Sequence, residues 1–150
     1  MPKYTKFALM IATSTVAMFI LMYLNTYSLD HIFWSQTRAW MALVMGAAMA
    51  IVMLLFMLGM YPSKAFNAAI LVAGVVVFAV ALYLVRSQAT VDQVSWMKAM
   101  IPHHSIAILT SERAGIQDPR VRKLADRIIE AQRREIEEMK ALIGELEQAR

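Results

Sequence analysis

The sequence predicts an all-α membrane protein, with three transmembrane helices followed by an antiparallel helical hairpin. The chain has 150 residues, of which 59% are hydrophobic and 17% are charged, whereas an ordinary soluble domain has about 25% charged residues. The charges are unevenly distributed, because residues 1–85 carry only Lys3, Lys6, Asp30, Arg38 and Lys64. The boundary between a transmembrane region and a polar tail is therefore placed between residues 88 and 89, which gives domains 1–88 and 89–150.

Three uncharged stretches, at about 7–24, 39–61 and 65–85, are each long enough to cross about 30 Å of hydrocarbon as a helix. Lys3 and Lys6 precede the first stretch as in a signal peptide, but no small-x-small cleavage site follows Leu24. We therefore interpret the first stretch as a retained span.

Three spans place the loop at residues 25–38 and the C-terminal tail on the same side of the membrane, together with all three histidines. The basic residues near the membrane are split almost evenly, with Lys3, Lys6 and Lys64 on one side and Arg38, Arg86 and Lys98 on the other. With the terminal amine added, this slight bias favours a cytoplasmic N-terminus and an extracytoplasmic tail.

The tail has the start and stop signals of two helices. Thr90 and Gln93 fit a capping box, and Gly115 is a residue type that commonly ends a helix. Asp118 and Pro119 are a typical N-cap and first position of a second helix. The predicted helices cover about 91–114 and 119–148, and the short connection makes them antiparallel.

Each predicted helix has a stripe that faces its partner. On the second helix the stripe is Ala125, Ile128, Gln132, Glu135, Met139, Leu142 and Leu146. On the first helix it is Val94, Met97, Ile101, His104 and Ile108, with Met100 and His103 beside it. Two helices cannot close a core alone, so we expect oligomerisation to complete a helical bundle.

Met97, Met100, His103 and His104 bring two thioethers and two imidazoles within about two helical turns. This donor set is typical of copper, and thioethers favour Cu(I) over Cu(II). The chain has no cysteine, which excludes disulfides and zinc–thiolate sites. The predicted metal ligands are His103, His104, Met97, Met100, Met139 and Glu135. Gln132 is expected to support a ligand without binding the metal itself.

Other roles for these residues stay open. Mutual hydrogen bonds would also satisfy polar residues on the seam, and Glu135 is either a ligand of Cu(II) or an acceptor that orients a histidine. Pro102 removes one helical hydrogen bond directly before the histidine pair. The spacing therefore does not decide which histidine is the ligand.

A methionine recurs every four residues in the second span, at Met41, Met45, Met49, Met53 and Met57. Such a stripe is usually a packing interface, but it is also a possible relay for metal, with His31 at the membrane surface. The spacing resembles that in the second span of eukaryotic high-affinity copper transporters, which also have three spans. The cysteine–histidine end motif of those transporters is absent.

The tail resembles the domain of unknown function family 305 over about residues 90–146. The residues that carry the resemblance are Met97-Lys-Ala-Met-Ile-Pro-His-His104, Ala107-Ile108, Asp118-Pro119, Leu124-Ala125, Ile128-Ile129, Gln132, Glu135-Ile136 and Met139. The resemblance implies a ferritin-like hairpin, found mostly in bacterial exported or membrane proteins and often linked to copper. It therefore implies a role in copper homeostasis or resistance.

Together these features predict a membrane-anchored copper-binding protein of the bacterial inner membrane, not an enzyme. A di-iron oxidase would need Glu-x-x-His pairs, and none occurs. No region is strongly one-signed, which argues against nucleic-acid binding. The alternative is a non-metal assembly module that oligomerises through the hairpin. The sequence does not identify a partner that delivers metal.

Overall fold

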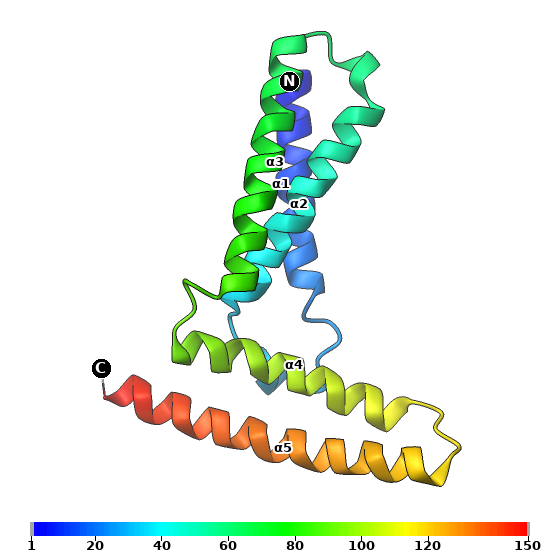
Figure 1. The fold of residues 1–150 in the computed structure, drawn as a ribbon, viewed down its shortest axis with the longest axis vertical. Coiled ribbons are helices and arrows are strands. Elements are labelled where there is room, and N and C mark those ends of the chain that lie inside the picture. Colours follow the sequence, from blue (N-terminus) through cyan, green and yellow to red (C-terminus); the bar gives the residue numbers. More distant parts are fainter. Residues whose placement is uncertain (1, 150) are drawn as a thin grey trace. The chain divides into compact units, whose positions relative to one another are not determined.

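A computed structural model describes residues 2–149, and within this range the chain has five α-helices, two short 3-10 helices and no strand (Figure 1). The all-α prediction is confirmed. The α-helices are α1 (Lys3–Leu21), α2 (Gln36–Phe56), α3 (Lys64–Ser87), α4 (Gln93–Arg113) and α5 (Pro119–Gln148). The 3-10 helices are η1 (Leu29–His31) and η2 (Leu58–Met60).

The helices form two compact units. The three-helix unit comprises the residues up to Met22 together with Thr37–Thr90, and the hairpin unit comprises Tyr23–Gln36 together with the residues from Val91 onward. The loop between α1 and α2 therefore packs with the C-terminal hairpin. The boundary predicted between residues 88 and 89 assigned this loop to the transmembrane region, whereas the structure assigns it to the hairpin unit.

Helices α1, α2 and α3 are long and apolar enough to cross a membrane, with mean hydropathies of 1.5, 2.4 and 2.8. Their surfaces expose large apolar side chains, among them Phe56 and Phe66, which suits contact with lipid. Helix α2 ends at Phe56, five residues before the expected end of the second span. Met57 therefore lies outside α2, in the turn that leads into η2.

Small residues allow the three helices to approach closely. A Cβ atom at Gly46 of α2 would lie 2.2 Å from Thr15 Oγ1 of α1, and one at Gly74 of α3 would lie 2.8 Å from Ile51 Cγ1 of α2. Glycines at such crossings increase the dispersion contacts on which membrane helices depend for association.

The Gly46 crossing gives a prediction. We expect Gly46→Ala to destabilise the α1–α2 contact by about 1–3 kcal/mol, because Thr15 is β-branched and cannot withdraw from the new methyl group. The same substitution in a Thr15→Ala background should cost much less. Thermal unfolding of both variants in detergent tests this expectation, and an equal loss in the two backgrounds would contradict it.

The first turn of α4 is capped differently from the expectation. Asp92 is the N-cap, and its side chain accepts a hydrogen bond from the Ser95 amide at 2.7 Å. The prediction that Thr90 caps this helix was wrong. The Thr90 hydroxyl instead accepts a hydrogen bond from the Trp40 indole at 3.2 Å, and Asp is an equally good cap two residues later.

The turn between α4 and α5 agrees with the sequence at only one of its two ends. Asp118 is the N-cap of α5 and accepts from the Arg120 amide at 2.8 Å, with Pro119 in the first turn, as predicted. Gly115 does not form the left-handed cap expected of it, because no glycine among the described residues has a positive φ. Helix α4 ends instead in an extended residue, Ala114, with φ −66° and ψ 136°.

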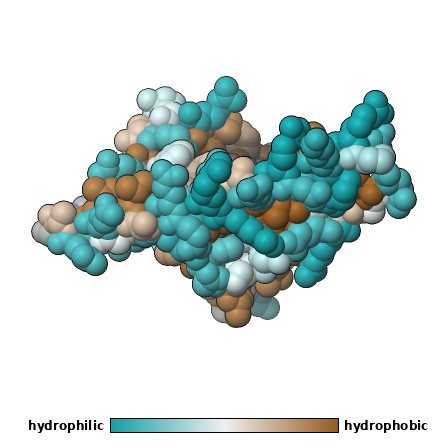
Figure 2. Space-filling model, turned by 90° about the horizontal axis from the view of Figure 1, so that it is seen from below, coloured by the Kyte–Doolittle hydropathy of each residue, from teal (hydrophilic) through white to brown (hydrophobic). Residues whose placement is uncertain are grey.

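Helices α4 and α5 run antiparallel and enclose an apolar core (Figure 1). The buried residues are Val94, Met97, Ile101 and Ile108 of α4 with Ile136, Met139 and Ile143 of α5. Figure 2 shows a face of the molecule on which hydrophilic side chains predominate, with hydrophobic patches between them. The hairpin is therefore apolar inside and mostly polar outside.

The seam of α5 differs from the prediction. Ile128 and Leu142 are 36% and 41% exposed, whereas Ile136, next to Glu135, and Ile143, next to Leu142, are buried. The residues that face inward are Ala125, Ile129, Gln132, Ile136, Met139, Ile143 and Leu146. This stripe keeps alternating steps of four and three and replaces Glu135 by Ile136, so it avoids the cost of burying a carboxylate.

Candidate metal site

His104 is the best-positioned of the predicted ligands. Its Nδ1 lies 3.0 Å from the Met100 carbonyl oxygen, and because a carbonyl only accepts, Nδ1 is the nitrogen that donates. The other nitrogen, Nε2, lies 2.7 Å from Glu135 Oε2. The His104 side chain is only 12% exposed, so the ring is held in one orientation with Nε2 directed at α5.

Glu135 and Gln132 form the other side of this contact. The Glu135 side chain is 45% exposed, and its Oε2 also lies 3.5 Å from Gln132 Nε2. His104 Nε2 and the Glu135 carboxylate are therefore adjacent on the seam. A metal ion at His104 Nε2 requires this nitrogen to be without a proton.

Three thioethers lie on the same seam. Met97 and Met139 are 5% and 7% exposed and belong to one buried cluster, against which Met100 packs. Met100 precedes His104 by four residues and Met139 follows Glu135 by four, so each shares a helix face with its partner. Because the helices are antiparallel, the turn before His104 lies opposite the turn after Glu135. Met100 and Met139 therefore lie about one turn from the His104–Glu135 contact, and Met97 about two turns.

His103 does not join this seam. It is exposed, and its ring centroid lies 6.2 Å from that of His104, with 63° between the ring planes. Successive residues on a helix point about 100° apart, so only one histidine of the pair can face α5. The structure therefore separates the two histidines that the sequence left equivalent.

Nitrogen and oxygen donors are too few for a site without sulfur. Among residues 2–149, no three His, Asp or Glu side chains converge in a way that could hold a metal ion. His104 and Glu135 supply two such donors, so the methionine sulfurs are the further donors that the seam offers. The seam thus brings together imidazole, thioether and carboxylate, of which only the thioethers are soft donors.

The loop between α1 and α2 docks onto α4 through Ser105. The Ser105 side chain is fully buried, and its Oγ accepts a hydrogen bond from the Tyr27 amide at 2.7 Å. His31 Nδ1 lies 3.0 Å from the same oxygen, and Phe33 packs against the hairpin core. His31 is thus fixed beside the residue that follows His104.

Sequence reasoning missed Ser105 and Phe33. It placed the loop and the histidine pair on one side of the membrane but gave no reason for contact between them. The available signal was Ser105 itself, a polar residue four positions after Ile101 on the apolar stripe of α4. A buried hydroxyl needs a partner, and the loop supplies two.

Charges hold the docked loop as well. Lys140 Nζ donates to Asp30 Oδ2 at 2.6 Å, and this bond, together with one from the Ser28 hydroxyl, lowers the pKa of Asp30 to about 2. Burial lowers the pKa of His31 from 6.5, partly opposed by the neighbouring Asp30 carboxylate. A pocket of about 330 Å³ adjoins these residues, lined by Tyr27, Ser28, His31, Ile108, Arg133, Ile136 and Glu137.

Docking of the loop should depend on pH. A histidine whose pKa is lowered in the docked state favours docking fully above its ordinary pKa of 6.5 and opposes it as the pH falls below that value. The Asp30–Lys140 bond adds a second loss below the ordinary Asp pKa of 3.8. We expect amide exchange of residues 23–36, corrected for the intrinsic rate at each pH, to accelerate below about pH 6.

His31→Gln is the control for this prediction, since glutamine does not titrate. The variant should lose the change near neutral pH and keep the loss in strong acid that comes from Asp30. A wild-type loop whose protection is constant from pH 8 to about pH 5 would contradict the assignment.

The methionine track lies in the three-helix unit. Met41 is 37% exposed, and Met45 and Met49 are half-buried. Met53 and Met57 pack against a buried cluster of Phe7, Leu54 and Tyr61. The C-terminal end of the track, Met53 and Met57, therefore has a packing role.

The C-terminal part of the chain is similar to a known protein family. Residues 85–150 match the family model described as domain of unknown function DUF305. The uncharacterized protein L153 of Acanthamoeba polyphaga mimivirus is 36% identical over 77 residues, which cover 50% of this chain and 51% of that protein. This chain thus spans about half the length of that relative. No solved structure matches the chain.

Proposed function

We propose that this is a membrane-anchored copper-binding protein that captures copper in its hairpin unit and acts in copper homeostasis or resistance. The observation that carries the proposal is the fixed orientation of His104. Its Nδ1 is engaged by the Met100 carbonyl, so its Nε2 points at Glu135 beside the methionines of the same seam. A ring held in this way is pre-organised to bind a metal through one nitrogen.

The donor chemistry favours Cu(I). Thioethers bind the cuprous ion well and hard divalent ions poorly. Because the chain has no cysteine, the methionines are its only soft donors. Methionine also remains a usable ligand in oxidising compartments, where thiols form disulfides.

Each residue of the site has a distinct role in this proposal. His104 supplies nitrogen, and Met97, Met100 and Met139 supply sulfur. The Met100 carbonyl orients the ring through Nδ1, Glu135 lies beside Nε2 as a further oxygen donor, and Gln132 holds Glu135. His103 is left out because it is exposed on another face of α4. The methionine track is also left out, because packing accounts for Met53 and Met57.

A second candidate function, assembly without metal, is favoured by one observation. Helix α5 exposes an apolar stripe on its outer side, formed by Val121, Leu124, Ile128 and Leu142. These residues lie at helical spacing on one face, which suits the corresponding stripe of a second copy. Glu135 lies on the same stripe, seven residues from both Ile128 and Leu142, so a second copy packed on the stripe would lie beside the proposed copper site.

The stoichiometry and affinity of copper binding test the proposal. Both are measured on the purified full-length protein and on the double variant His103→Ala/His104→Ala. We expect binding in the wild type that is lost in the variant. Binding that survives in the variant would move the site into the three-helix unit, and absence of binding in both would leave assembly as the function of the hairpin.

A further inference from the structure

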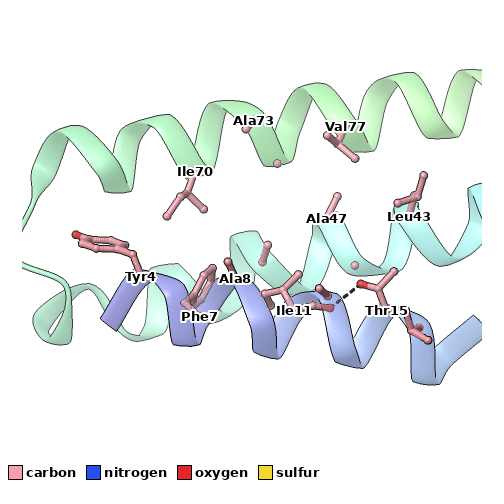
Figure 3. Close-up of a pocket in the computed structure, with 15 residues that line it drawn as sticks. Tyr4, Phe7, Ala8, Ile11, Thr15, Leu43, Ala47, Ile70, Ala73 and Val77 are labelled. Atoms are coloured by element: carbon pink, nitrogen blue, oxygen red, sulfur yellow. Dashed lines mark hydrogen bonds between the residues drawn. The ribbon is translucent and has the colours of Figure 1, made fainter. Parts of the chain in front are cut away.

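A groove of about 560 Å³ runs between α1, α2 and α3 (Figure 3). Ile70, Ala73 and Val77 of α3 line one side, and residues of α1 and α2 line the other. Its width comes from small residues, Ala8 and Ala12 of α1 and Gly46 and Ala47 of α2 among them. The groove is thus a property of the three-helix unit alone.

The polar groups that border the groove already have partners. The Tyr4 hydroxyl donates to Asn67 Oδ1 at 2.9 Å. The Thr15 hydroxyl donates to the Ile11 carbonyl at 2.8 Å (Figure 3). An occupant therefore finds no unsatisfied donor or acceptor in the groove. Because the groove lies on helices suited to lipid, its occupant has to be apolar.

The charges at one end of the groove have no counter-ions within the unit. The three-helix unit contains five basic residues and no acidic residue, the basic ones being Lys3, Lys6, Arg38, Lys64 and Arg86. Lys3 lies in the first turn of α1, where its Nζ donates to the Met60 carbonyl at 3.3 Å. Lys64 begins α3 beside Ser63, whose amide donates to the Tyr4 hydroxyl at 3.1 Å. Both lysines are exposed, whereas Lys6 lies on the face of α1 opposite Tyr4. Lys3 and Lys64 thus place two ammonium groups at the Tyr4 end of the groove.

The length of the groove fits one leaflet of a bilayer. Its lining on α1 extends from Tyr4 to Val16, which at about 1.5 Å per residue is about 18 Å. Half of the hydrocarbon thickness of a membrane is about 15 Å. An acyl chain that starts at the lysines therefore ends where the groove ends.

We propose that the groove binds an acyl chain of an anionic phospholipid, whose phosphate lies between Lys3 and Lys64. Basic pockets at the membrane surface recognise anionic headgroups in this way. A helix from a second copy would also fill the groove. It would not neutralise the lysines, because the three-helix unit of that copy has no acidic residue either.

The test uses the full-length protein in detergent, incubated with phosphatidylglycerol or phosphatidylcholine and examined by native mass spectrometry. The wild type should retain phosphatidylglycerol several-fold better than phosphatidylcholine. Lys3→Gln/Lys64→Gln should abolish that preference, whereas Lys123→Gln/Arg127→Gln, which removes the same charge from exposed positions of the hairpin, should keep it.

Variants that fill the groove test the place of the acyl chain. Ala12→Phe, and the milder Ala73→Leu, should reduce retention of both lipids, while Val72→Phe on the exposed side of α3 should not. Equal retention of the two lipids by the wild type, or unchanged retention in both groove variants, would overturn the proposal. Loss of a dimer in place of a lipid in those variants would assign the groove to a second copy.

Discussion

Replacing His104 with alanine is expected to lower the affinity of the full-length protein for Cu(I) more than about 100-fold. Loss of a residue that merely supports a ligand costs about 10–100-fold, and His104, unlike His103, directs its Nε2 at the seam. Competition titration with a Cu(I) chelator measures the change. The effect should exceed that of any other single substitution in the hairpin.

His103→Ala is the matched control for that experiment. It removes the same side chain from the neighbouring position, where the ring is exposed. We expect the affinity of this variant to equal that of the wild type. A larger loss from His103→Ala than from His104→Ala would show that the wrong histidine has been assigned.

Ile136→Ala is expected to destabilise the hairpin by about 2–5 kcal/mol, because it removes a buried side chain and leaves a cavity. Ile136 is 1% exposed in the core between α4 and α5. Chemical unfolding followed by tryptophan fluorescence measures the change, since Trp34 and Trp96 both lie in the hairpin unit.

Ile128→Ala makes the same chemical change on the outer face of α5, where Ile128 is 36% exposed. We expect a loss of about 0.5 kcal/mol or less, as for most surface positions. If Ile128→Ala were the more damaging substitution, the seam predicted from the sequence would be correct and the observed one wrong.

The seam of α5 shows what the hydrophobic periodicity of a sequence can and cannot predict. Helix α5 has apolar residues at adjacent positions, such as Ile128 with Ile129 and Leu142 with Ile143, so two stripes one residue apart compete for the core. The predicted stripe followed alternating steps of three and four and passed through Glu135. The structure buries Ile136 and still brings Glu135 to His104 from the edge of the seam, where the carboxylate stays half-exposed.

Local signals were more reliable where the chemistry of one residue decides the outcome. Asp118 and Pro119 begin α5 as predicted, because a carboxylate cap and a proline without an amide both suit a first turn. The docking of the loop through Ser105 was beyond such reasoning. It joins residues 78 apart in sequence, and no local pattern specifies a contact at that separation.

The ligands of bound copper, identified by X-ray absorption spectroscopy of the full-length protein loaded with Cu(I), test the central claim most directly. The account predicts a mixed shell with at least one sulfur and one imidazole nitrogen, and loss of the imidazole signal in His104→Ala. A shell of nitrogen and oxygen alone would contradict it, since the buried methionines would then have no part in binding. So would an imidazole signal that persists in His104→Ala.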